Sequence, residues 1–387
     1  MRVAYISPIF YSDVDLSYLN ELRKIADVYY FIPIGPLKKA AAVDIENIYP
    51  KSGIFPTSIY PELSKFGSLI DLDKTFIINR TVPHVSYPQN LKVYWKLYKF
   101  IKKLGVDVVH ITSSLLYTQF PLYLFRKKMV LSVHDPLPHA NVTSLRSDMQ
   151  LKIAYKLIKH LVIFNSAQKV AFISRYHLQN KNIHLSQLSA YTYLTAYDTN
   201  VPIIKGDYIL FFGWIRQGKG VENLLPAMKR VHEVYPNLRL VVAGKGAYYF
   251  DKTEYENLDY LDFINRFIPD YELANLIANC KFVVVPYTEA TQSGVIMSAY
   301  AFAKPVLATN VGGLPEMVGD DEFGRIVQAG SIDALVEGIT NMAGNSSHLP
   351  QYSESIKKAY FTGEKSWASI AKDMFCNCYQ RIVKDSV

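Results

Sequence analysis

The sequence predicts an α/β protein built from two doubly wound domains. Its 387 residues are too many for one ordinary core and suit two domains of similar size. Short apolar runs recur along the chain with helix-like stretches between them, as in parallel sheets covered by helices on both faces. A stretch rich in Tyr, Thr and Ser interrupts this alternation at residues 188–202. We therefore expect domains at 1–195 and 203–366, facing each other across a cleft, and an amphipathic helix at about 367–387 that is free to pack back onto the first domain.

Five apolar runs in each half are the predicted strands. They are residues 3–8, 28–32, 106–111, 129–133 and 170–174 in the first domain, and 208–212, 238–243, 258–261, 281–285 and 305–309 in the second. After the first strand, apolar side chains recur at helical spacing at Leu16, Leu19, Leu22 and Ile25. Ligands of doubly wound sheets bind beyond the carboxyl ends of the strands, so the loops that follow strands are the candidate sites.

A glycine-rich loop follows the first strand of the second domain. It runs from Phe212 to Gly220 and precedes a helix-like stretch that starts at Val221. Glycines let a phosphate approach backbone amides, and a helix N-terminus adds partial positive charge. Arg216 and Lys219 supply two cations within the turn, which suits a diphosphate. Taken alone, the loop could equally be a solvated surface turn.

Two further strand-to-helix loops of the second domain resemble it. In residues 286–295, Ser293 and Gly294 stand where amides at a helix start can bind phosphate oxygens, and Glu289 lies just ahead of them. Residues 310–316 again combine glycines with a following acid. Three such loops after strands of one domain indicate a site for a phosphate-bearing ligand.

In the first domain, two histidines and an acid follow a predicted strand. His134 and Asp135 come directly after residues 129–133, and His139 lies a few positions later. A structural histidine is the commoner interpretation of any single one. The expected place of His134 beside the cleft favours a functional role.

These residues carry a resemblance to the family 4 retaining glycosyltransferases of the GT-B fold, in which two Rossmann-like domains face each other. The motifs stand in the family's order and spacing over most of the second domain, and more weakly at His134–Pro136 and in the helix with Trp367. They are Phe211–Gly213 with Lys219–Gly220, Val242–Gly244, Phe267–Asp270 with Glu272–Leu273, Ser293–Gly294, and Lys304–Val306 with Val311–Glu316.

The resemblance implies a nucleoside diphosphate sugar donor, a saccharide or lipid-linked acceptor, retention at the anomeric carbon and no metal. It implies that Arg216 and Lys219, in the loop bounded by Gly213 and Gly220, neutralise the diphosphate. The other implied contacts are phosphate and sugar at Ser293, Gly294 and Val295, the nucleobase at Gly244, Phe267 and Ile268, and the transferred sugar at His134. The setting implied by the family is assembly of a surface polysaccharide or glycolipid.

The chain also departs from the family pattern. The usual pair of glutamates eight residues apart falls on Ala290, next to Glu289, and on Ser298. Ser298 could take over the ribose contact through its hydroxyl, and Glu289 remains the candidate acid. Trp214 replaces an arginine that many members carry after the glycine.

Three other functions compete with this interpretation. A metal-dependent transferase of the GT-A type would use a pair such as Asp13 and Asp15 or Asp71 and Asp73, a pattern common by chance. A catalytically inactive nucleotide-sugar-binding or interaction protein would explain the broken glutamate pair. A phosphorylase or epimerase of the same fold is the third, although no pyridoxal-lysine context is present.

The net charge of +8 is concentrated in the first half. Between residues 91 and 160 twelve bases face three acids, and no zinc-finger, RNP-type or helix-turn-helix pattern accompanies them. An anionic membrane surface or substrate is therefore favoured over nucleic acid. In residues 92–103, four lysines share one side of a predicted helix whose neighbouring face is apolar. With no long apolar run and no signal-like start, we expect a cytoplasmic protein, peripheral on the inner face of a membrane.

Overall fold

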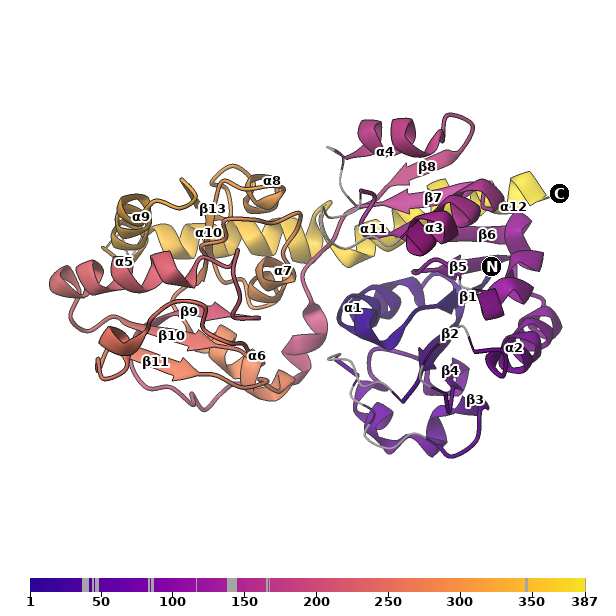
Figure 1. Cartoon of the computed structure of the whole chain (residues 1–387), viewed down its shortest axis with the longest axis horizontal. Coiled ribbons are helices and arrows are strands. Elements are labelled where there is room, and N and C mark those ends of the chain that lie inside the picture. The colour runs from indigo at the N-terminus through magenta and orange to yellow at the C-terminus, as the bar shows by residue number, and fades with distance from the viewer. Residues whose placement is uncertain are drawn as a thin grey trace. The chain divides into compact units, whose positions relative to one another are not determined.

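A computed structural model of the chain describes residues 1–36, 42, 43, 45, 49–82, 84, 87–115, 117–137, 145–164, 166, 168–344 and 347–386. The chain divides into two compact units (Figure 1). The first unit comprises Met1–Leu188 and Trp367–Val387, and the second comprises Ser189–Ser366. Among the described residues, no helix is long and apolar enough to cross a bilayer.

An eight-stranded sheet forms the centre of the first unit. Its order is β3-β4-β2-β1-β5-β6-β7-β8, and only β3 runs antiparallel to its neighbour. The strands are β1 (Arg2–Ile6), β2 (Asp27–Ile34), β3 (Gly53–Pro56), β4 (Thr75–Asn79), β5 (Val108–Ile111), β6 (Met129–Val133), β7 (His160–Ile163) and β8 (Asn182–Leu185). The parallel strands are apolar because helices cover both faces of the sheet.

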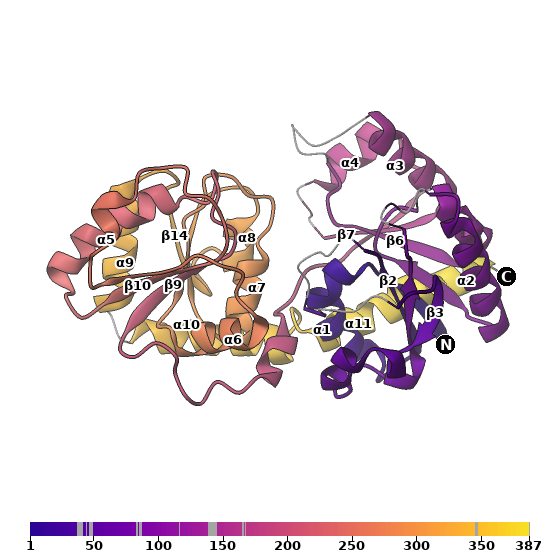
Figure 2. The same cartoon turned by 60° about the horizontal axis from the view of Figure 1, so that its bottom comes forward.

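Alternate residues of β1 point to these two helical layers. Ala4 and Ile6 face a core beneath α2 (Asn90–Leu104), the 3-10 segment η5 (Tyr117–Lys128), α3 (Leu145–Leu157) and α4 (Lys169–Tyr176). On the other side, Tyr5 contacts Tyr18 of α1 (Ser12–Leu22). The chain ends in α11 (Trp367–Asp373), η9 (Met374–Tyr379) and α12 (Gln380–Ser386). Helix α11 lies beside α1 in this layer, and α12 reaches η5 (Figures 1 and 2).

Six parallel strands form the sheet of the second unit. They are β9 (Tyr208–Phe212), β10 (Arg239–Ala243), β11 (Leu261–Ile264), β12 (Val283–Val285), β13 (Val306–Thr309) and β14 (Gly324–Val327), in the order β11-β10-β9-β12-β13-β14. The helices of this unit are α5 (Val221–Val234), α6 (Asp270–Asn279), α7 (Gly294–Ala301), α8 (Leu314–Val318), α9 (Ile332–Gly344) and α10 (His348–Lys357). Counted within the unit, the order is that of the dinucleotide-binding fold, whose switch point lies between its first and fourth strands, here β9 and β12.

One strand prediction in the first unit is wrong. Residues 170–174 belong to helix α4, where Phe172 is buried and Val170 is 79% exposed. The strand in this region is β7, whose apolar residues follow the end of α3 almost without interruption, so the sequence shows no boundary between them. Strands β3, β4, β8 and β14 were not predicted either.

The ends of both units depend on tertiary contacts. The amide of Tyr191 donates to the carbonyl oxygen of Met297 at 3.0 Å, so the predicted domain end at residue 195 lies inside the second unit. In the terminal helices, the hydroxyl of Tyr379 lies 2.6 Å from Nδ1 of His110 and 3.1 Å from the hydroxyl of Tyr18. These contacts hold the last helical stretch on the first unit.

Candidate active site

The loop after β9 is pressed against the loop after β12. Gly220 caps α5 with φ +71°, and a Cβ built there would lie 1.8 Å from the carbonyl oxygen of Pro286. Across the same junction, the amides of Thr288 and Glu289 donate to the carbonyl oxygen of Gly218, at 3.0 and 3.4 Å. A side chain at Gly220 would therefore force the two loops apart.

Two other loops join the same edge of the sheet. Gly244, after β10, has φ +149°, and a Cβ there would lie 1.8 Å from the carbonyl oxygen of Gly213. After β13, the amide of Gly313 donates to the carbonyl oxygen of Thr291 at 3.2 Å. The glycine-rich and polar loops singled out in the sequence thus meet beyond the carboxyl ends of four strands.

Arg216 and Lys219 bring two positive charges to this edge. Arg216 is exposed, whereas the amine of Lys219 lies 3.5 Å from the ring centroid of Tyr287. Burial, with a smaller contribution from Arg216, lowers the pKa of Lys219 to about 8. Within the described part of the chain neither side chain forms an ion pair. Both cations are therefore available to an anionic ligand.

The N-terminus of α7 opens onto the same loops. Gly294 is its first residue, and Ser293 precedes it without capping any amide through its side chain. The first amides of a helix have no intrahelical acceptor and favour an anion. The side chain of Val295 lies 3.6 Å from the point where a Cβ on Gly213 would stand. Ser293, Gly294 and Val295 therefore adjoin the glycine-rich loop.

The remaining predicted residues of this unit have different environments. Glu289 is exposed, and its carboxylate lies beside Gly218. Ser298 is buried, and its hydroxyl donates to the carbonyl oxygen of Gly294 at 2.9 Å. Between β11 and α6, Phe267 is 53% exposed and Ile268 is buried. Ser298 can therefore offer a ligand only lone pairs, and Phe267 a free aromatic face.

His134 follows β6 in the first unit. Its ring is stacked between Tyr11 and Phe164, with centroids 4.0 and 5.0 Å away. Burial lowers the pKa of His134 to about 4, so the ring is neutral near pH 7, and its Nε2 is buried without a hydrogen-bond partner. The second histidine of the motif, His139, lies outside the described residues.

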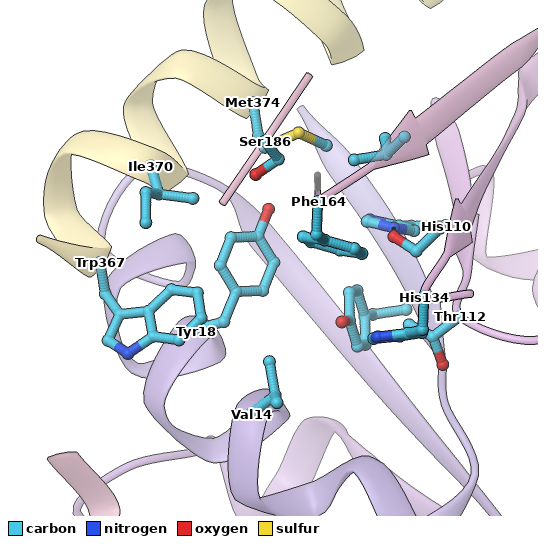
Figure 3. A pocket seen from close by; sticks show the side chains of 13 residues that line it. Val14, Tyr18, His110, Thr112, His134, Phe164, Ser186, Trp367, Ile370 and Met374 are labelled. Carbon is cyan, nitrogen blue, oxygen red and sulfur yellow. Dashed lines mark hydrogen bonds between the residues drawn. The ribbon is translucent and has the colours of Figure 1, made fainter. Parts of the chain in front are cut away.

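A small pocket of the first unit is lined by His134 and by the C-terminal helices (Figure 3). Tyr18 points into it, with Trp367 and Ile370 of α11 on one side and Phe164 on the other. His110, which also lines it, is bound through Nδ1 to Tyr379 and through Nε2 to Ser132. Sequence reasoning missed this network, because residues so distant in the chain leave no local pattern.

The candidate metal-binding aspartate pairs have structural partners. Asp15 is buried and accepts hydrogen bonds from the hydroxyls of Tyr5 at 2.8 Å and Tyr30 at 3.0 Å. Asp71 caps the short helix η4 (Leu72–Lys74) by accepting from the amide of Asp73. In each motif at least one carboxylate therefore has a structural role.

Solved structures share the two-unit architecture. A sucrose-phosphate synthase from Thermosynechococcus elongatus aligns over 99% of each chain with a TM-score of 0.64 and 17% identity. The two sheets of mainly parallel strands with flanking helices give the chain the GT-B fold.

Sequence comparisons identify the activity class. Residues 206–345 match the family described as glycosyl transferases group 1. An uncharacterized glycosyltransferase of Methanocaldococcus jannaschii is 25% identical over 75% of this chain and 81% of its own length. A GDP-mannose:glycolipid 4-beta-D-mannosyltransferase of Xanthomonas campestris is 35% identical over 26% of this chain and 29% of its own. The chain is a glycosyltransferase of the GT-B fold, and its second unit carries a glycosyl transferases group 1 domain.

Proposed function

We propose that this enzyme transfers a sugar, with retention at the anomeric carbon, from a nucleoside diphosphate sugar to a hydroxyl group of a saccharide or lipid-linked acceptor. The observation that carries the proposal is the pair of cations, Arg216 and Lys219, without ion-pair partners in the described chain, beside the N-terminus of α7. Two cations and a helix start at a strand-end edge suit a diphosphate.

The proposed chemistry places these groups on the leaving phosphate. As the bond from the anomeric carbon to the donor phosphate breaks, negative charge grows on the phosphate oxygen. Arg216, Lys219 and the amides at the start of α7 stabilise that charge, a role that a divalent ion has in metal-dependent enzymes. The leaving phosphate takes the proton of the acceptor hydroxyl, whose oxygen bonds to the same face of the sugar. Configuration is then retained without a protein nucleophile.

We assign the rest of the donor to neighbouring residues. Gly244, Phe267 and Ile268 border the nucleobase, for which the exposed ring of Phe267 is a stacking surface. Ser298 accepts a hydrogen bond from a ribose hydroxyl, since its own proton is donated to Gly294. Glu289 is exposed and its carboxylate lies beside Gly218 of the glycine-rich loop, so we assign it contacts with the transferred sugar.

Assembly of a surface polysaccharide or glycolipid is the proposed setting. The name of the mannosyltransferase from Xanthomonas campestris makes GDP-mannose a first donor and a glycolipid a first acceptor to test. A lipid-linked acceptor would place the enzyme at the cytoplasmic face of a membrane. One observation supports the alternative of an inactive nucleotide-sugar-binding protein: Ala290 and Ser298 stand at the positions of the usual glutamates.

A thermal-shift screen of nucleotide sugars tests the donor class. A donor at about a hundred times its Kd should stabilise the protein by roughly 2.7 kcal/mol, whereas free hexoses should give no shift. A stabilising donor that is neither hydrolysed nor transferred would identify a binding protein instead. Absence of a shift with every nucleoside diphosphate sugar would reject the proposed donor site.

His134 should affect transfer without affecting donor binding. We expect His134→Ala to leave nucleotide affinity nearly unchanged and to lower kcat, because the ring belongs to the first unit, whereas the proposed phosphate loops belong to the second. His134→Phe is the matched control, since it keeps the stack between Tyr11 and Phe164 but lacks the nitrogens. Nucleotide affinity from calorimetry and kcat from turnover, measured for both variants, distinguish the effect of losing the stacked ring from the effect of losing the ring nitrogens. Lost nucleotide affinity with normal kcat would refute the assignment.

A further inference from the structure

Large apolar side chains are exposed where α2 meets η5. Trp95 of α2 is 36% exposed, and Phe120 and Leu124 of η5 are 49% and 51% exposed. The rings of Trp95 and Phe120 are in contact, with centroids 6.0 Å apart, and Trp95 also contacts Tyr98 at 5.7 Å. We call Trp95, Phe120 and Leu124 the ridge, an exposed group of apolar side chains on α2 and η5.

Helix α3 exposes a second apolar row. Met149, Ile153 and Leu157 are 50%, 43% and 41% exposed. Their spacing of four residues places them one above another along one side of the helix. An amphipathic helix of a globular domain normally turns such a stripe toward the core. Here the core contacts come from the other side, through Ala154, Tyr155 and Ile158.

The ridge and the row face outward from one helical layer. The buried sides of α2, η5 and α3 contribute to one core on one face of the sheet. Figure 2 shows α2 and α3 on the same side of the first unit. We call their outer surface the docking face; its apolar members are Trp95, Phe120, Leu124, Met149, Ile153 and Leu157.

The docking face is strongly basic. The three elements that carry its apolar residues also carry exposed bases, and in the described chain none of the five lysines of α2 forms an ion pair. Of the three acids between residues 91 and 160, Asp148 pairs with Lys152 at 2.8 Å. The exposed bases of the described α2, η5 and α3 side chains are Lys92, Lys96, Lys99, Lys102, Lys103, Arg126, Lys127, Lys128, Lys152 and Lys156.

We propose that the docking face binds the surface of an anionic lipid bilayer. Lysines and arginines around an exposed Trp and Phe match a surface that offers negative headgroups outside and apolar chains beneath. Aliphatic side chains such as Ile153 and Leu157 gain nothing from a nucleic-acid backbone, which is contacted by bases and by stacked aromatics. A second copy of this face would bring like charges together. Anionic lipid is thus the partner that fits both the positive charge and the exposed apolar side chains of the docking face.

Flotation with vesicles of 30% phosphatidylglycerol in phosphatidylcholine, against phosphatidylcholine alone, tests the proposal. We expect binding to the anionic vesicles at low salt. Binding should be lost in 0.5 M salt, because the Debye length is then short and the attraction between bases and headgroups is screened. K92Q/K96Q/K99Q/K103Q should weaken binding about a thousandfold, because each of the four bases near a charged surface contributes about 1 kcal/mol. K51Q/K205Q/K358Q/K372Q removes the same charge elsewhere and should bind as the wild type does. No flotation with anionic vesicles, or equal loss in both variants, overturns the proposal.

Quenching by brominated acyl chains tests whether the ridge inserts. We expect anionic vesicles with brominated lipid to quench wild-type tryptophan fluorescence, and W95F to lose most of this quenching while still floating. Unchanged quenching in W95F would contradict insertion of the ridge. Tighter binding to a single-stranded oligonucleotide than to anionic vesicles, lost in the same lysine variant, would assign the face to nucleic acid. Donor-induced thermal shifts should not change in any of these variants, so failure here leaves the proposed donor site untouched.

Discussion

Replacing Lys219 with alanine should lower kcat by on the order of a hundredfold, and Arg216→Ala should have an effect of similar size. Each change removes one cation from the phosphate oxygen on which charge grows in the transition state. Lys219 also lies over Tyr287, so its amine is held at the edge of the site rather than moving freely in solvent. The measurement is steady-state transfer with the donor identified by thermal shift.

Two controls distinguish this role from loss of folding or of net charge. Lys229→Ala removes an exposed charge from α5, outside the site, and should leave kcat unchanged. Because the pKa of Lys219 is about 8 in the free enzyme, donor affinity should fall as pH rises above 8, when the amine loses its proton. In Lys219→Arg this pH dependence should disappear. Normal turnover by a well-folded Lys219→Ala enzyme would reject the assigned role.

The sequence predicted strands best where apolar runs end at turn residues. Residues 208–212 and 129–133 match β9 and β6 residue for residue. It failed where apolar helix and strand adjoin, as at α3 and β7, since periodicity cannot divide a continuous run. Helix α4 shows the reverse error. The apolar run from Val170 to Ile173 is typical of a buried strand, but in the structure it is helical and only Phe172 of the helix is buried.

The loops of the second-unit site could be predicted because parallel strands bring their carboxyl ends to one edge. The side-chain contacts across that edge could not be predicted. Tyr287 carried no local signal, yet its ring lies directly beneath the amine of Lys219. From the sequence the hydroxyl of Ser298 was expected to contact a ligand, whereas in the structure it donates its proton to the carbonyl oxygen of Gly294 in the same helix. Such details depend on which backbone atoms packing brings near, and a single sequence does not encode these as a pattern.

Asp15 is a buried acid in the first unit that should make stability depend on pH. Burial raises the pKa of Asp15 to about 7, against the opposing hydrogen bonds from Ser7, Tyr5 and Tyr30. Asp13 nearby has a pKa of about 6, also raised by burial. In the unfolded chain Asp15 loses its proton near pH 4. Between these values the folded protein binds more protons, so this contribution to stability is full below pH 4 and lost as pH rises through 7.

Asp15→Asn should remove this dependence, because the amide does not titrate and can still pair with the hydroxyls of Tyr5 and Tyr30. Relative to the wild type, the free energy of unfolding of Asp15→Asn should rise by about 2 kcal/mol between pH 5 and 7 and level off above pH 8. Urea unfolding in a Trp214→Phe background measures it, since Trp95 and Trp367 then report on the first unit. Tyr30→Phe is the companion variant: losing one donor to the ionised carboxylate should move the fall in stability to higher pH. A difference between Asp15→Asn and the wild type that stays constant from pH 5 to 8 would show that Asp15 ionises normally in the folded protein.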